Sequence, residues 1–276
     1  MAALLPRETY GRRATKEDFI DVSDDRAIEW NRGVRTPHNG TLTIVGDFDE
    51  KMVRQWVEES FGEWETRAPI IVAPPGMKAA TGEPVETRLL KTPRPGSSQA
   101  ELRFGCLLPR ASTGAVVATH RIAASVLKDR LWRLLRDTLG ATYDVDVASV
   151  ALQGGTAWLE LSTNVANEKL AASLRTTHQT LLALAREPIS ADELAWGRMD
   201  RAAHVARSQM TNESVAALYH SRTTLGLAVE PAAIRAELDA VTADGVREAL
   251  QSCLAANPIM AIVGDEAMVQ EAWKSW

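Results

Sequence analysis

The sequence predicts an α+β fold, and three observations predict it. Apolar and polar residues alternate along 98–108, 143–147 and 157–161, which is the period of half-buried β-strands. Long segments with helical spacing of apolar residues follow these strands, an order that favours α+β over strictly alternating architectures. The third observation is an internal repeat, because residues 22–62 and 241–276 carry the same order of features.

The repeat has the form of a helix–strand–helix unit used twice. Ser23 and Thr242 are the predicted N-caps of the first helix in each copy, since a hydroxyl accepts from a free backbone N–H, and they are 219 residues apart. A Val-Gly-Asp motif that ends the strand follows in both copies, at an offset of 218 residues. Each copy then continues into an amphipathic helix.

A period of this length is too long for a solenoid, so we expect two homologous domains. Residues 1–62 are then the C-terminal part of an incomplete first domain, and residues 84–276 form a complete second domain. Residues 63–83 are rich in Pro and Gly and are expected to be a linker. About 180 residues of the second domain precede its copy of the repeat, so we expect a similar length to belong before Met1.

The elements of the second domain follow from local patterns. Gly154 and Gly155 mark the turn of an antiparallel hairpin with one solvent-exposed face. Pro188 ends one helix, and Ser190 with Glu193 forms the capping box that begins the next. The expected elements are, in order, strands over 85–91 and 98–108, a helix over 113–139, hairpin strands at 143–147 and 157–161, and helices from 170, over 190–225, at 230–239 and at 242–255.

Composition excludes several classes of function. The net charge of −5, without a strongly basic region, argues against bulk attraction to nucleic acid or anionic lipid. No apolar run approaches 18 residues, so we expect a soluble protein without a membrane span, in the cytoplasm or the periplasm. Cys106 and Cys253 are too few for a disulfide framework, and Cys106 is expected to be inert core. Sequence motifs for a hydrolase nucleophile, a phosphate-binding loop or a redox Cys pair are missing.

One segment resembles a known family. Residues 131–143 read LWRLLRDTLGATY, which is similar to the L-x-x-x-L-R-E-x-x-G-x-x-Y segment of the M16 (pitrilysin-like, processing-peptidase-like) zinc peptidases, in their C-terminal, non-catalytic domain. Asp137 stands where the family usually has Glu. The glycine hairpin, the helix start at 189–194 and the terminal Val-Gly-Asp occur in the family's order, and residues 10–12 and 37–42 resemble the end of the preceding domain.

The resemblance implies two domains of one fold, each a mainly antiparallel sheet with helices on one face, closing around an extended peptide. In the family one half carries His-x-x-Glu-His and holds zinc, while the other supplies an Arg and a Tyr that grip the substrate. Arg136 and Tyr143 are the matching positions here. Both also have a structural interpretation, because an arginine near a helix C-terminus favours the dipole and a tyrosine is common in strands.

None of the five histidines forms His-x-x-Glu-His, so we expect this chain to bind no zinc and to be inactive alone. Asp200 and His204 are one helical turn apart, which is expected to be a solvated helix pair. The predicted function is the substrate-binding, non-catalytic half of an M16-like zinc metallopeptidase. Its predicted partners are a peptide or unfolded polypeptide substrate and a zinc-bearing domain or subunit. The zinc of the full assembly is expected on that catalytic half.

Several alternatives remain open at this point. The zinc-bearing half is either part of the same polypeptide or a separate subunit. The chain is alternatively a zinc-less scaffold of the same fold without a peptidase role, similar to the core subunits of a respiratory complex. An unrelated α+β binding protein that matches by chance is a further alternative.

Overall fold

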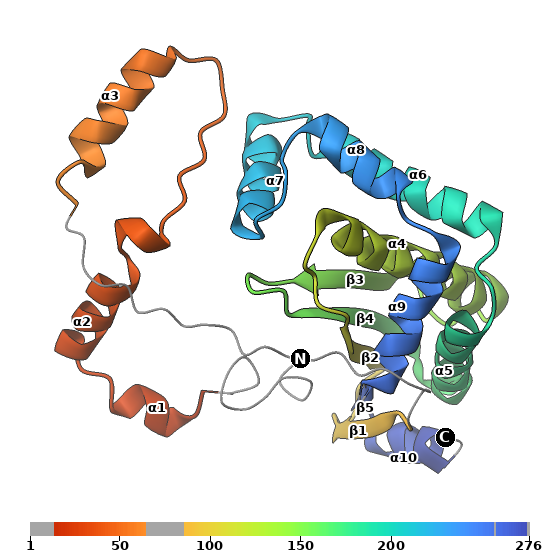
Figure 1. The fold of residues 1–276 in the computed structure, drawn as a ribbon. Coiled ribbons are helices and arrows are strands. Elements are labelled where there is room, and N and C mark those ends of the chain that lie inside the picture. Colours follow the sequence, from red (N-terminus) through yellow and green to blue (C-terminus); the bar gives the residue numbers. More distant parts are fainter. Residues whose placement is uncertain (1–13, 65–85, 257, 275–276) are drawn as a thin grey trace.

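A computed structural model describes residues 14–64, 86–256 and 258–274 (Figure 1). Its centre is a five-stranded sheet of order β1-β5-β2-β4-β3. The strands are β1 (Arg88–Pro93), β2 (Gln99–Leu108), β3 (Val145–Ala151), β4 (Ala157–Ala166) and β5 (Ile259–Gly264). β1 and β5 are parallel and every other neighbouring pair is antiparallel, which confirms the predicted, mainly antiparallel sheet.

Helices cover one face of this sheet in two layers (Figure 1). The inner helices contact the strands and one another: α4 (Gly114–Leu131), α5 (Leu170–Arg186), α9 (Ala243–Ala255) and α10 (Glu266–Lys274). The outer helices α6 (Ala191–Arg207) and α8 (Pro231–Asp239) pack on α4, and α7 (Asn212–Thr224) joins them. The single helical region expected over 190–225 is therefore two helices, because Thr211 caps a new one. None of the described helices is long and apolar enough to cross a bilayer.

Strand β2 shows why the sheet faces the helices as it does. The apolar side chains at its alternating positions are all buried: Ala100, Leu102, Phe104, Cys106 and Leu108. The opposite face carries Gln99, Glu101 and Arg103, which are partly or fully exposed. The predicted alternation is thus confirmed, and it places the core between the sheet and the inner helices.

The two cysteines lie in the core and are bonded to each other. Cys106 of β2 and Cys253 of α9 form a disulfide, with their Cα atoms 5.1 Å apart, which lies in the usual range for such a bond. Both are fully buried, which agrees with the core environment expected for Cys106. The pair is 147 residues apart in sequence, and only the packing of α9 on β2 brings the sulfurs together.

The β3–β4 hairpin has the predicted antiparallel register, with Val150 opposite Trp158. Gly154 and Gly155 both have φ near +87°, a conformation that favours glycine and makes the turn. The strand begins at Val145, however, and Tyr143 precedes it with 87% of its surface exposed. The expectation that Tyr143 alternates with the strand residues on the apolar face is therefore wrong.

The first copy of the repeat agrees with the second in its helices but not in its strand. Described helices here are α1 (Lys16–Ile20), α2 (Asp24–Val34) and α3 (Glu50–Phe61), with the short 3₁₀ helix η1 (Pro37–Asn39). Ser23 caps α2 and Thr242 caps α9, as predicted. Residues 41–45 form no strand, whereas β5 lies between β1 and β2. A strand needs a hydrogen-bonded neighbour, and within the described residues this segment has none. The predicted linker lies almost entirely outside the described residues.

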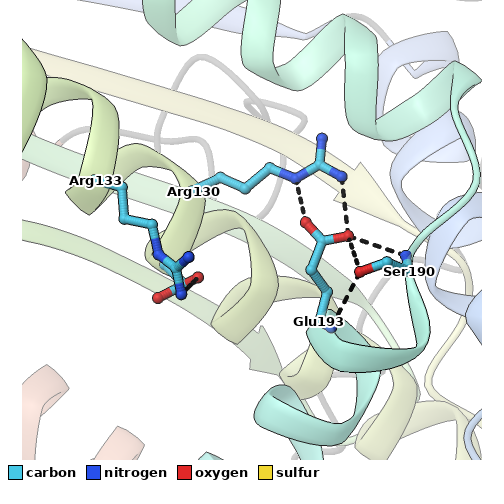
Figure 2. Close-up of polar contacts among 5 residues, drawn as sticks. Arg130, Arg133, Ser190 and Glu193 are labelled. Atoms are coloured by element: carbon cyan, nitrogen blue, oxygen red, sulfur yellow. Dashed lines mark hydrogen bonds and ion pairs between the residues drawn. The ribbon is translucent and has the colours of Figure 1, made fainter.

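A partly buried ion pair between Arg130 and Glu193 connects the start of α6 to α4 (Figure 2). Ser190 and Glu193 form the predicted capping box, in which the Glu193 backbone N–H donates to the Ser190 hydroxyl at 3.2 Å. Arg130 of α4 also donates from Nε and Nη2 to the two carboxylate oxygens of Glu193, at 2.5 and 3.1 Å. The hydrogen bond from Arg130 is the main reason that the pKa of Glu193 is lowered to about 2.

This arrangement predicts a pH-dependent loss of stability in Glu193→Gln. A carboxyl whose pKa is lowered by folding stabilises the fold above its unfolded pKa, near 4.5, and that contribution is lost as the pH falls toward 2. We expect the variant to lose about 1–3 kcal/mol at pH 7 and the difference from wild type to shrink between pH 5 and pH 2. Urea unfolding across this range measures it. The matched control is Glu213→Gln, an exposed glutamate in the first turn of α7, and a Glu193→Gln deficit that is independent of pH would contradict the assignment.

Candidate functional site

The segment that resembles the family motif lies in an unusual helix. α4 continues into a π-helix, η2 (Trp132–Thr138), rather than into the ordinary helix expected up to residue 139. The wider winding is followed by Gly140, whose φ of +57° ends the helix, and the Gly140 N–H donates to the Arg136 carbonyl at 3.0 Å. π-helical turns are rare and are frequently found at functional sites.

The π-helix places Arg136 between two aromatic rings. Its guanidinium carbon lies 4.5 Å from the centre of the Trp132 ring and 6.0 Å from the centre of the Tyr143 ring. Arg136 Nη1 also donates to the Tyr143 carbonyl at 3.1 Å. A guanidinium carries five N–H donors, so this geometry holds the group in place and leaves donors for a ligand. The structure thus brings together the two residues that the sequence singles out, Arg136 and Tyr143.

The loop that carries Tyr143 is anchored to the sheet. The Thr142 hydroxyl donates to the Asp144 carbonyl at 2.9 Å and lies 2.9 Å from the hydroxyl of Thr163 on β4. The Ala166 N–H donates to the Ala141 carbonyl at 3.0 Å. These contacts fix the backbone on both sides of Tyr143, while its side chain stays exposed. The phenol is therefore presented to solvent from a rigid position.

Trp132 is the part of this site that the sequence interpretation missed. Its ring packs against the Arg136 guanidinium, a cation–π contact that contributes about 0.5–2 kcal/mol. The available signal was the spacing of four residues between Trp132 and Arg136 on one helix, which places two side chains on the same face. Trp132 also lines a cavity of about 870 Å³ that lies among α4, β3, α6 and α7. The arginine site and this cavity are therefore neighbours.

The described residues offer no site for zinc. No group of three or more His, Cys, Asp or Glu side chains within residues 14–64, 86–256 and 258–274 is arranged to hold a metal ion. His120 is buried in α4, and burial lowers its pKa to about 4, so it is neutral at physiological pH. Asp200 is half-buried, accepts a hydrogen bond from Ser125 Oγ at 2.7 Å and lines the cavity together with the exposed His204.

Comparison with known proteins identifies the family. Residues 23–198, more than half of the chain, match the family described as "Peptidase M16 inactive domain". The structure of a peptidase M16 inactive domain from Pseudomonas fluorescens is similar, with 12% identity, a TM-score of 0.75 and coverage of 93% of this chain and 61% of that one. A protease from Helicobacter pylori is 13% identical, with a TM-score of 0.74 and coverage of 91% of this chain and 61% of that one. A chain of Complex III2 from Candida albicans is 11% identical, with a TM-score of 0.70 and coverage of 95% of this chain and 64% of that one.

At these identities the solved structures show a shared fold alone. The chain spans about three fifths of the length of each of them. No curated protein matches it by sequence. The family match covers nearly the whole first repeat copy and the Arg136 segment, and the fold of the sheet domain agrees with it. The chain therefore belongs to the peptidase M16 inactive-domain family.

Proposed function

We propose that this chain is the substrate-binding, non-catalytic half of an M16-like zinc metallopeptidase. The observation that carries the proposal is the placement of Arg136, which is held by Trp132 and by the Tyr143 carbonyl beside an exposed phenol. A fixed guanidinium donates to a peptide carbonyl or to the oxyanion that develops from it, and a tyrosine hydroxyl adds a second donor. Such donors complete a site whose metal lies on a facing half when the two halves close.

The first copy of the repeat supports a facing half. On α3 the side chains of Met52 and Trp56 are 48% and 54% exposed, whereas Val269 and Ala272 on the corresponding α10 are 1% exposed because they pack on the sheet domain. Residues 1–62 belong in this proposal to the end of a first M16-like domain, and residues 84–276 form the second. The apolar face of α3 would then cover a sheet to which residues 41–46 add a strand.

The experiment that tests the site is photocrosslinking in the full assembly with the zinc-bearing half. A non-cleavable peptide carrying a photoreactive phenylalanine is expected to label the segment from Trp132 to Asp144, since this segment presents Arg136 and Tyr143. Mass spectrometry locates the label. Labelling spread evenly over the outer helices, with none in this segment, would contradict the proposal.

The fold of a Complex III2 chain supports a second candidate, a zinc-less scaffold of the same fold. A scaffold needs stable partners but no exposed donors on a rigid loop. The two functions differ in one readout, because an assembly built around a scaffold hydrolyses no peptide.

A further inference from the structure

The cavity beside Trp132 has a wall composition that the proposed function does not explain. Its volume is about 870 Å³. Trp132, Val147 and Trp196 supply apolar surface, and three arginines, Arg121 of α4 with Arg201 and Arg207 of α6, supply positive charge. In Figure 1, α6 and α7 lie beyond α4 on the side away from the sheet, so the cavity lies where these layers meet the edge strand β3.

Two of the three carboxylates in this wall pair with other cations, Asp129 with Arg133 at 2.9 Å and Asp146 with Lys128 at 3.6 Å. The third, Asp200, accepts from the neutral Ser125 hydroxyl at 2.7 Å, and its charge opposes the lowering of the Arg201 pKa. Among the described residues, none of the three arginines forms an ion pair with a carboxylate.

The arginines are also close enough to act on one another. Burial, and then the charges of Arg201 and Arg222, lower the pKa of Arg121 to about 10, so the group stays charged at neutral pH. Burial is likewise the main cause of the lowered pKa of His204, followed by the charges of Arg201, Arg121 and Arg207. Glu237 opposes this effect at Arg121, but both of its oxygens accept from Arg222. The cavity wall therefore carries four cationic side chains, the three arginines and Lys128, against the three aspartates.

We propose that this cavity is a subsite for a carboxylate side chain of the bound peptide, taken up by Arg121, Arg201 and Arg207. A guanidinium matches a carboxylate with two parallel hydrogen bonds, and it keeps its charge in partly buried places. The ring of Trp132 contacts Arg136 and forms part of the cavity wall, so a peptide gripped at Arg136 would place a neighbouring side chain here. The apolar walls suit the methylene stem of a glutamate better than they suit a free inorganic anion. The inference rests on the proposed peptide-binding role.

The test is direct binding of peptides to the 276-residue chain. Fluorescein-labelled peptides of about twelve residues are compared by anisotropy in matched pairs that differ only in Glu or Gln at one position. We expect the best Glu peptides to bind roughly 10- to 100-fold more tightly than their Gln partners, the range of a charge-assisted hydrogen bond. Arg201→Gln should reduce this preference to less than about 3-fold. Arg235→Gln, which makes the same change of charge on the exposed surface of α8, should leave it intact.

The outcomes separate this inference from the proposed function. Peptide binding that depends on Arg136 but shows no preference for Glu overturns the subsite alone, whereas no binding of either peptide overturns the subsite and the proposed function together. Tight binding of inorganic phosphate without a preference for Glu peptides assigns the cavity to small anions and overturns the subsite. If Arg201→Gln fails to fold by circular dichroism, the exposed Arg207→Gln replaces it, and an unchanged preference in that folded variant also overturns the subsite.

Discussion

If the proposed function is correct, replacing Arg136 by Ala is expected to lower kcat/KM for peptide hydrolysis by the proposed assembly by about 100-fold or more. The guanidinium is positioned by the Trp132 ring at 4.5 Å and by the Tyr143 carbonyl at 3.1 Å, so it offers donors to the peptide without a further ordering cost. Loss of one donor to a developing oxyanion lowers rates by about 10²- to 10³-fold. Steady-state hydrolysis of a quenched fluorescent peptide by the assembly with the zinc-bearing half measures the change.

The matched control for this variant is Arg133→Ala in the same π-helix. Arg133 is exposed and pairs with Asp129 at 2.9 Å, and such surface pairs contribute less than about 1 kcal/mol. Its kcat/KM should stay within about 3-fold of wild type. Equal rates for the Arg136→Ala and wild-type assemblies, with assembly verified by gel filtration, would remove Arg136 from the mechanism.

Replacing Arg222 by Met is expected to destabilise the chain by about 3–5 kcal/mol. The Arg222 side chain is 2% exposed, and its Nη2 donates to both Glu237 oxygens at 2.7 and 2.8 Å, while Nε donates to the Ala228 carbonyl. This pair joins α7 to α8. Removing one partner leaves the Glu237 carboxylate uncompensated in a partly buried place, and breaking such a pair is costly. The midpoint of urea unfolding measures the loss.

Two further variants test the cause of that loss. Glu237→Leu added to Arg222→Met should restore much of the stability, because an apolar pair has no unpaired charge to bury. Arg235→Met breaks the exposed pair with Asp239 on α8 and should change stability by less than about 1 kcal/mol. A loss below 1 kcal/mol in Arg222→Met would show that the buried pair is dispensable.

Local patterns in the sequence were sufficient to predict most of the elements. The alternation along β2 is a property of neighbouring residues, and so are the hydroxyl caps of α2 and α9 and the capping box of α6. Each depends on side chains within about four positions of one another. The same patterns placed β1 three residues too early, since its outer positions are exposed and carry little alternation.

The remaining features depend on tertiary contacts. The disulfide between Cys106 and Cys253 requires α9 to pack on β2, and the cavity requires four elements to meet around Arg201. Residues 41–45 have the composition of a strand, but the part of the chain that the structure describes offers them no neighbour to pair with, so composition alone predicted a strand that is not formed there. The π-helix could not be predicted from the sequence either, because the same helix-forming residues are compatible with i→i+4 and with i→i+5 hydrogen bonds. For the candidate site, the resemblance supplied Arg136 and Tyr143, and only the structure added Trp132.

Whether this chain works within a zinc peptidase is decided by the metal content and the peptide hydrolysis of its native assembly. The protein is tagged and purified from its native cells together with its bound partner subunits and any further part of the same polypeptide. This assembly is then assayed for zinc content and for hydrolysis of a quenched fluorescent peptide library. We predict about one zinc ion per copy of the chain and hydrolysis that is lost when a chelator removes the metal. A stable assembly that contains no zinc and hydrolyses no peptide would contradict the peptidase role and favour the scaffold.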